Sequence, residues 1–195
     1  MGEVYSARQL NLNRDVAIKV ISDEFLQSFA DDESEKEKYL QRFRREVQTM
    51  SQVRHPNVLQ TFDYGQTSIT KDGAEVYLEY IIMEYVPGAT LGFTMSEEGF
   101  NANEQQIKAW LINFFLPVLD GVQALHNSGI VRRDLKPDNV LMDGNIPKIA
   151  DFGLARSCRL KPVTQSVDIH GTMNYMPSEQ FLDFKRANPG SPNFF

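Results

Sequence analysis

The periodicity of the apolar residues changes at Pro87-Gly88, and this change limits the folds that the chain can adopt. Runs of β-branched and aromatic residues, bounded by turn-forming residues, predict strands within residues 2–21, 58–64 and 75–85. Beyond the break, apolar residues from about 103 to 127 recur at three- and four-residue steps, which predicts a long helix. Because proline and glycine together interrupt regular structure, we place a boundary there and expect two parts, residues 1–86 and 87–195.

One helix is also predicted in the first part. Its apolar stripe consists of Leu40, Phe43, Val47 and Met50. The acidic stretch before it, residues 22–38, is expected to be solvated rather than packed. In the second part, the apolar face of residues 103–127 is broad, so we expect this helix to be mostly buried and to be kinked at Pro117.

Two short segments carry the chemistry of the chain. Residues 133–139 read Arg-Asp-Leu-Lys-Pro-Asp-Asn, and Asp151-Phe152-Gly153 begins twelve positions after the Asn. Phosphoryl transfer from Mg-ATP needs one Asp to accept the proton of a substrate hydroxyl, while an Asn and a second Asp hold Mg²⁺ against the phosphates. The spacing of Asp134, Asn139 and Asp151 predicts this chemistry.

Composition excludes several other classes. The 195 residues are enough for one large domain or two small lobes, and the formal net charge of -6 argues against a nucleic-acid or anionic-membrane partner. The single cysteine, Cys158, permits no intrachain disulfide and fits a reducing cytoplasm. The longest apolar run, Trp110–Leu119, is too short to span a membrane, and the N-terminus lacks the pattern of a signal peptide.

The chain resembles a protein kinase of the serine/threonine type. In chain order, the matching residues are Gly2-Glu3-Val4, Val16-Ala17-Ile18-Lys19, Glu46, His55-Pro56-Asn57, Met83-Glu84-Tyr85-Val86, the loop around Asp134, Asp151-Phe152-Gly153, and Gly171-Thr172 through Glu179. The resemblance implies an α+β, bilobal fold. Residues 1–86 would form a small β-rich N-lobe with one helix, and residues 87–195 an incomplete, mainly helical C-lobe.

The resemblance also assigns residues to ATP. Lys19 would bind the α- and β-phosphates and pair with Glu46, which agrees with the need of a lysine in an apolar strand for an anion. The remaining implied contacts are Gly2 to the phosphates, Val4, Ala17 and Leu141 around the adenine ring, and the main chain of Glu84 and Val86 at its edge. On the residues alone, Lys19 as a strand-edge lysine and Glu46 as a surface charge remain alternatives.

The same resemblance assigns the catalytic roles. Asp134 would orient the substrate hydroxyl, and Lys136 would neutralise charge that develops on the transferred phosphate. Asn139 and Asp151 offer the oxygen ligands that Mg²⁺ prefers. ATP, Mg²⁺ and a protein with a Ser or Thr acceptor are therefore the expected partners.

Arg133 is typical of kinases activated by phosphorylation after the Asp-Phe-Gly motif, because a guanidinium group binds phosphate bidentately. Thr164 and Ser166 are candidate acceptors, with ordinary loop hydroxyls as the alternative.

The chain departs from the family pattern in four places. Arg132 stands where the family usually has His, and Pro177-Ser178 stands where it reads Ala-Pro before Glu179. The chain begins inside the glycine-rich loop and ends about 16 residues after Glu179, so we expect a domain truncated at both ends. A catalytically silent pseudokinase, or a truncated ATP-binding or regulatory module, is the alternative function.

Overall fold

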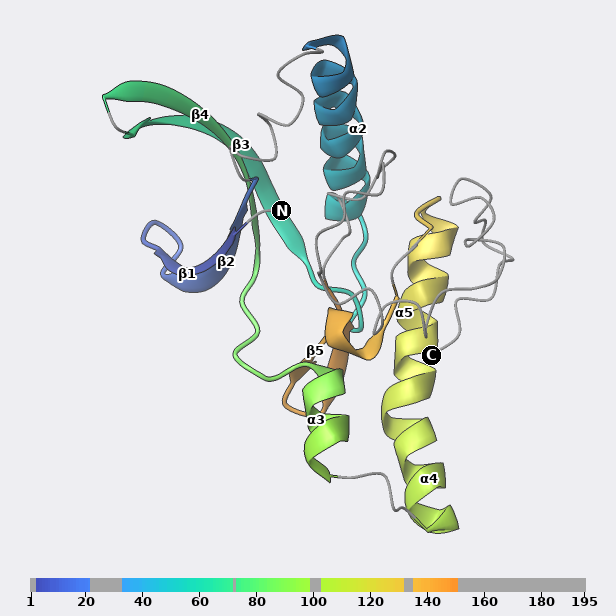
Figure 1. Ribbon diagram of the computed structural model, residues 1–195. Helices are drawn as coiled ribbons and strands as arrows, with labels where there is room; N and C mark the ends of the chain where they lie inside the picture. The colour runs from blue at the N-terminus through green and yellow to red at the C-terminus, as the bar shows by residue number, and fades with distance from the viewer. Residues whose placement is uncertain (1–2, 22–32, 72, 99–102, 132–134, 151–195) are drawn as a thin grey trace, which may run out of the picture. The chain divides into compact units, whose positions relative to one another are not determined.

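The chain forms two compact units in a computed structural model that describes residues 3–21, 33–71, 73–98, 103–131 and 135–150 (Figure 1). The first unit comprises Met1–Arg54 with Leu59–Val86, and the second comprises His55–Val58 with Pro87–Phe195. The four residues 55–58 therefore belong to the second unit although both of their flanking segments belong to the first.

A four-stranded antiparallel sheet is the framework of the first unit. Its strands are β1 (Glu3–Gln9), β2 (Arg14–Val20), β3 (Thr61–Lys71) and β4 (Ala74–Glu84), in the order β1-β2-β4-β3. The three predicted strand regions are confirmed, but β3 begins at Thr61 rather than at 58 and continues to Lys71. Long cross-strand pairing with β4, from Thr61 opposite Met83 to Lys71 opposite Ala74, explains the extension.

The predicted helix of the first unit is α2 (Glu33–Ser51). All four residues of its predicted apolar stripe are buried. The helix begins at Glu33, so residues 33–38, which were expected to precede it, belong to α2, while Ser34, Glu37 and Lys38 are exposed to solvent as expected. Glutamate and lysine are good helix formers, and Glu37 and Lys38 lie exposed on the helix surface. Residues 22–32 lie outside the described ranges.

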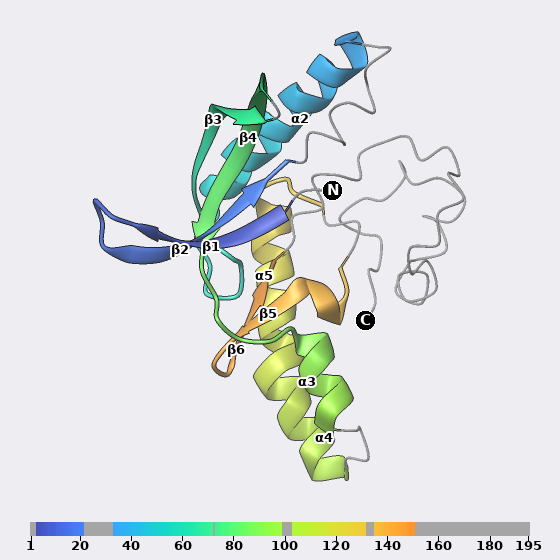
Figure 2. The ribbon, with the colours of Figure 1, turned by 60° about the vertical axis from the view of Figure 1, so that its left-hand side comes forward.

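The helix α2 lies against the sheet (Figure 2), and aromatic rings join the two. Tyr39 and Phe43 stack one turn apart on the helix, with ring centroids 6.5 Å apart. The ring of Phe43 then meets the edge of Tyr64 on β3, at a centroid distance of 5.9 Å. These contacts place α2 across one face of the sheet, where Ile81 and Met83 of β4 are also buried.

Helices dominate the second unit. They are α3 (Leu91–Glu98), α4 (Glu104–Trp110), the π-helical segment η1 (Leu111–Phe115) and α5 (Leu116–Asn127). The last three form one continuous rod (Figure 2), which confirms the predicted helix. Asn103 and Gln106 start it with a reciprocal capping box. Pro117 lies in the first turn of α5, directly after the π-helical segment. The helix α3 was not predicted.

The expectation that this helical rod is mostly buried is wrong for the described part of the chain. Val118, Gly121 and Leu125 of α5 are its buried residues. Its exposed apolar residues are Ile107, Leu111, Ile112, Leu116 and Leu119. A wide apolar face predicts burial only where other elements cover its full width, and β6 packs on the side that carries Val118 and Leu125.

The rod ends in a turn that redirects the chain. The N–H of Gly129 donates to the carbonyl of His126, and the N–H of Ile130 donates to that of Leu125, both at 2.9 Å. This pair of bonds with Gly129 at φ 75° is a Schellman motif, which favours glycine because other residues are strained there. The turn sends the chain from α5 through buried Ile130 toward residues 132–139.

A short hairpin follows, made of β5 (Val140–Asp143) and β6 (Ile146–Ile149), with the 3₁₀ turn η2 (Pro137–Asn139) before it. Asn57 is seated against this hairpin. Its carbonyl accepts from the N–H of Ile149, and its side-chain amide donates to the carbonyl of Pro147, both at 2.9 Å. Gly121 of α5 permits the approach, since a Cβ there would lie 2.7 Å from the Asn57 carbonyl oxygen. In the described residues, none of the helices is long and apolar enough to span a bilayer.

Candidate functional site

The predicted site residues fall into three groups. Val4, Ala17, Lys19, Glu46, Glu84 and Val86 are described in the first unit, and Lys136, Asn139 and Leu141 in the second. Gly2, Asp134 and Asp151 lie outside the described residues, as do Arg132, Arg133, Thr164, Ser166 and the segment around Glu179.

Strand register gathers three of the predicted residues on one face of the sheet. Val4 is paired with Lys19, and Lys19 is paired with Ile81 on β4. Directly paired residues lie on the same face, as do residues two apart on one strand, so Ala17 joins them opposite Met83. Val4, Ala17 and Lys19 are therefore neighbours on one face although 15 positions separate Val4 from Lys19.

The helix α2, which carries Glu46, covers that same face. Glu79 lies two residues before Ile81 on β4 and binds Arg44 of α2, which assigns this face to the helix. Glu46 is half-buried. Burial raises the pKa of Tyr39, and the charges of Glu46 and then Glu79 raise it further. The hydroxyl of Tyr39 is therefore affected by the charges of two carboxylates, that of Glu46 on α2 and that of Glu79 on β4.

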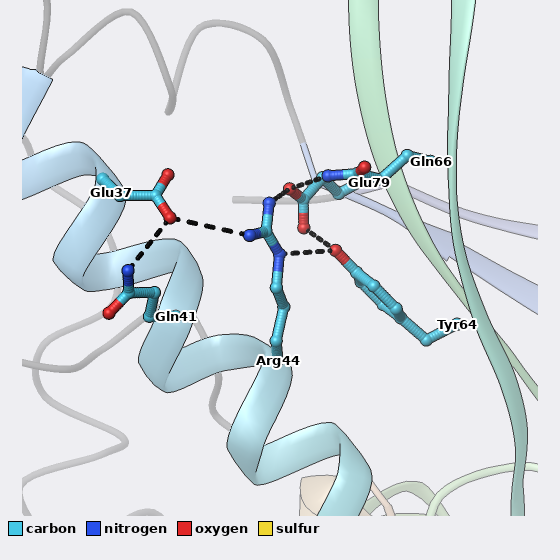
Figure 3. A network of polar contacts seen from close by, with 6 residues as sticks. All are labelled: Glu37, Gln41, Arg44, Tyr64, Gln66 and Glu79. Atoms are coloured by element: carbon cyan, nitrogen blue, oxygen red, sulfur yellow. Dashed lines mark hydrogen bonds and ion pairs between the residues drawn. The ribbon is translucent and has the colours of Figure 1, made fainter.

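A polar network between α2 and the sheet was not predicted (Figure 3). Glu79 is 5% exposed and accepts from Arg44 Nη2 at 2.6 Å, from Gln66 Nε2 at 2.8 Å and from the Tyr64 hydroxyl. Arg44 Nε also donates to the Tyr64 hydroxyl at 3.1 Å. The hydrogen bonds to Glu79 and Tyr64 raise the pKa of Arg44. A glutamate between apolar residues of a strand was the sequence signal for this network.

The last strand of the first unit leads to the predicted adenine edge. The N–H of Glu84 donates to the carbonyl of Gln60 at 2.9 Å, and the Glu84 carboxylate accepts from the N–H of Gln60 at 3.3 Å. These bonds fix the main chain at the end of β4, two residues before Val86. Because its N–H is used in this way, Glu84 would pair with a ligand through its carbonyl.

In the second unit, the hairpin explains the twelve-residue spacing between the two proposed metal ligands. Val140 is paired with Ile149, and just outside this pair the N–H of Ala150 donates to the carbonyl of Asn139 at 2.8 Å. The end of the Arg-Asp-Leu-Lys-Pro-Asp-Asn segment and the residue that precedes the Asp-Phe-Gly segment therefore lie side by side. Asn139 and Ala150 are both buried.

Lys136 and Leu141 flank this point. Lys136 is extended, with φ -152° and ψ 159°, and its carbonyl accepts from the N–H of Asn139 at 2.9 Å, which closes the 3₁₀ turn. Leu141 pairs with Lys148 on β6 and bridges to Thr90, and the N–H of Met142 donates to the carbonyl of Ala89 at 2.9 Å. The segment after Pro87 is thereby joined to the hairpin that carries the predicted residues.

The oxygen donors at this point suit a hard divalent cation. Asn139 is buried and carries a side-chain amide oxygen, and Ala150, whose N–H donates to the backbone carbonyl of Asn139, is followed in the sequence by Asp151 with its carboxylate. Amide and carboxylate oxygens are the ligands that Mg²⁺ takes, usually together with water and phosphate oxygens. The residues present therefore fit the expected metal.

The fold and the two sets of residues define the chain as a protein kinase. The family model described as the protein kinase domain matches residues 1–191, and the chain belongs to this family. A solved structure, that of a mutant PknI kinase domain from Mycobacterium tuberculosis, is similar with a TM-score of 0.58 and 27% identity, over 80% of this chain and 56% of that one. The predicted family and the α+β kinase fold are confirmed.

The chain is also similar to curated proteins that are named serine/threonine kinases. The chain is 38% identical over 185 residues to the serine/threonine-protein kinase PknB of Mycobacterium leprae (strain TN), and 34% identical over 182 residues to the serine/threonine-protein kinase PrkC of Bacillus subtilis (strain 168). Each match covers 92% of this chain but only 26% and 25% of the two relatives. The chain thus spans about a quarter of the length of these kinases.

Proposed function

We propose that this chain is the catalytic part of a serine/threonine protein kinase, which transfers the γ-phosphoryl group of ATP to a Ser or Thr hydroxyl of a protein. The observation that carries the proposal is the hydrogen bond from the N–H of Ala150 to the carbonyl of Asn139, because it joins the last residue of one motif to the residue that precedes the other. The names of the relatives support the choice of serine and threonine as acceptors.

The catalytic steps follow from the chemistry of the side chains. Phosphoryl transfer is mostly positioning and charge neutralisation, so Asp134 chiefly orients the acceptor hydroxyl and takes its proton as the new P–O bond forms. The ammonium group of Lys136, two residues on, neutralises charge on the γ-phosphate as its bond to the leaving oxygen of ADP breaks. The extended backbone of Lys136 and the turn that follows fix its distance from Asn139.

Residues of both units take part in ATP binding in this proposal. Lys19 binds the α- and β-phosphates and Gly2 approaches them closely, while Val4, Ala17 and Leu141 pack on the adenine ring. The carbonyl of Glu84 and the main chain of Val86 pair with its edge. Support comes from the register that sets Val4, Ala17 and Lys19 on one face, and from α2, which brings Glu46 over that face.

Asn139 and Asp151 would hold Mg²⁺. The ion, when bound, neutralises the phosphate oxygens and keeps the β- and γ-phosphates in a fixed geometry. The support from the protein is the hairpin, whose end joins the main chain of buried Asn139 to that of Ala150, the residue that precedes Asp151.

We also propose a cytoplasmic protein with a protein substrate and no nucleic-acid partner. The formal net charge of -6 supports the absence of a nucleic-acid partner, because such partners select basic surfaces. The single cysteine and the use of ATP support the location.

A comparison of two Asp variants in the same loop tests the proposal. The full-length protein should transfer phosphate from ATP to a generic basic protein, and Asp134→Asn should lower this rate by roughly 10²–10⁴-fold. The control is Asp138→Asn, which makes the same change at an exposed position four residues on and should keep most of the activity. A folded protein no faster than its Asp134→Asn variant would refute the proposal.

The pseudokinase alternative predicts a different pattern from the same proteins. It requires that Mg-ATP raise the melting temperature of the wild type while phosphate transfer stays at the level of the Asp134→Asn variant. Arg132, in the place where the family usually has His, is the residue to revert in that case, and Arg132→His would be expected to restore turnover.

A further inference from the structure

The network around Glu79 lies outside the predicted site, yet it joins α2, which carries Glu46, to β3 and β4 of the sheet whose strand β2 carries Lys19. Glu79 on β4 is buried and has three hydrogen-bond donors, two of them from β3 and one from α2 (Figure 3). In this ion pair Glu79 is buried while the Arg44 side chain is 36% exposed. Such a pair contributes little net stability, because the cost of removing charge from water offsets most of the attraction. Its main effect is geometric, since a planar guanidinium group binds a carboxylate in a defined orientation.

Arg44 and Glu46 lie on opposite sides of the buried stripe of α2. Phe43 and Val47 form the centre of the buried stripe. At about 100° per residue, Arg44 and Glu46 project about 80° to either side of that centre. Arg44 is bonded on its side to β3 and β4, and Glu46 lies on the opposite flank of the same stripe. The rotation of α2 about its own axis therefore determines the directions in which both side chains, Arg44 and Glu46, project from the helix.

Lys19 stands on the face over which Glu46 is held. Lys19 is paired with Ile81, and Ile81 is two residues from Glu79, so Lys19 and Glu79 emerge on the same face of the sheet. A roll of α2 by about 20° moves a side-chain tip about 5–6 Å from the axis by about 2 Å. Displacements of about 1 Å in a catalytic site can lower a rate by about 10²-fold.

We propose that Arg44, held by Glu79 and Tyr64, is a positioning residue that sets the rotation of α2 and thereby aims Glu46 at Lys19. The inference rests on the proposed function, in which Lys19 binds the phosphates of ATP. Glu37 belongs to the same network, since its carboxylate lies 3.6 Å from Arg44 Nη1 and accepts from Gln41 at 3.2 Å. It is more exposed than Glu79, so its contribution to the geometry is the smaller one.

The test separates positioning from stability. Replacing Arg44 alone would leave the buried Glu79 carboxylate without a cation, although Gln66 and Tyr64 still donate to it, and loss of the cation is destabilising. In the double variant Arg44→Met/Glu79→Met both charges are removed, and such replacements are often neutral or stabilising. The full-length protein with this pair should melt within a few degrees of the wild type and yet lose roughly tenfold to a hundredfold in kcat/KM for ATP. Wild-type kcat/KM in the double variant would overturn the proposal.

A cycle with Glu46 shows whether Arg44 acts through it. Glu46→Gln removes the charge that Arg44 is proposed to aim, so adding Arg44→Met/Glu79→Met to Glu46→Gln should lower the rate no further. If the loss of rate in the combined variant equals the product of the losses in Glu46→Gln and in Arg44→Met/Glu79→Met, the proposal is overturned. If the double variant does not fold, Arg44→Lys serves in the same cycle. It keeps the charge opposite Glu79 but lacks the fork that also reaches Tyr64, and an unchanged rate in Arg44→Lys would equally overturn the proposal.

The control is Arg45→Gln, which removes the same charge one residue on, where the side chain is exposed, and should leave the rate unchanged. The control also distinguishes the two proposals. If the wild type and Arg45→Gln both fail to exceed Asp134→Asn, the proposed function is lost. If both transfer phosphate and the Arg44 variants match them, only the positioning role is lost.

Discussion

The side-chain amide of Asn57 donates a hydrogen bond to the carbonyl of Pro147 at 2.9 Å, although 90 positions separate the two residues. With the bond from Ile149 to the Asn57 carbonyl, it fixes residues 55–58 to the hairpin that follows Asn139. The segment between α2 and β3 is thereby built into the second unit.

Replacing Asn57 should destabilise the second unit. Asn57→Ala removes a buried donor and leaves the Pro147 carbonyl without it, so we expect the free energy of unfolding to fall by about 1–3 kcal/mol. Urea denaturation followed by circular dichroism measures the change. Asn113→Ala, at an exposed helical position, is the control and should shift the value by less than about 0.5 kcal/mol.

A methyl group at Gly121 should have a similar effect by overpacking. The added Cβ would lie 2.7 Å from the Asn57 carbonyl oxygen, a backbone atom, and 3.0 Å from Ile149 Cδ1. We expect Gly121→Ala to cost about 1–3 kcal/mol, even though alanine favours helices. Gln123→Ala, on the exposed side of α5, should be neutral or stabilising in the same denaturation experiment. Equal stability of the two variants would contradict the packing described here.

The environment of Tyr64 predicts a loss of stability in alkali. Burial, and then the hydrogen bond to Glu79, raise the pKa of Tyr64 from 10.0 to about 12. Between these pH values the folded protein keeps a proton that the unfolded chain loses. The contribution of Tyr64 to the free energy of unfolding is therefore fully present below pH 10 and is lost as the pH rises from 10 toward 12. Denaturation at several pH values should show a weaker decline in Tyr64→Phe over this interval. Between pH 7 and 9, the difference between the two proteins should be constant.

Removing the Asn139 amide should raise the requirement for magnesium. In Asn139→Ala, Asp151 would remain the only one of the two proposed protein ligands, so we expect the Mg²⁺ concentration for half-maximal rate to increase by about tenfold or more. Rates of phosphate transfer at fixed ATP and varied free Mg²⁺ measure this change. Asn145→Ala, in the exposed turn of the same hairpin, is the matched control. An unaltered magnesium dependence in a folded Asn139→Ala protein would remove Asn139 from the metal site.

Local sequence patterns predicted the positions of the main helices and the family of the protein. The apolar stripe of α2 could be read from spacing, because helix period and burial of one face are properties of neighbouring residues. The start of the long helix near 103 was predictable for the same kind of reason, since Asn103 and Gln106 cap it locally. The spacing of Asp134, Asn139 and Asp151 indicated the family, which the match over residues 1–191 confirmed.

Other features depended on partners distant in the chain. The start of α2 at Glu33 and the helix α3 were not evident, because polar and small residues there give a weak period. Burial of the 103–127 helix was overestimated because an apolar face does not say what covers it.

The sequence by itself determined the family and the residues proposed for catalysis, since ordered short motifs need no knowledge of distant contacts. Only the tertiary structure decided which of these residues become neighbours. Strand register set Val4 beside Lys19, the hairpin set Asn139 beside Ala150, and the packing of α2 on β3 and β4 joined Arg44 to Glu79. The physical reason is that hydrogen-bond pairing and side-chain packing act between segments far apart in the chain, where no local pattern specifies the partner.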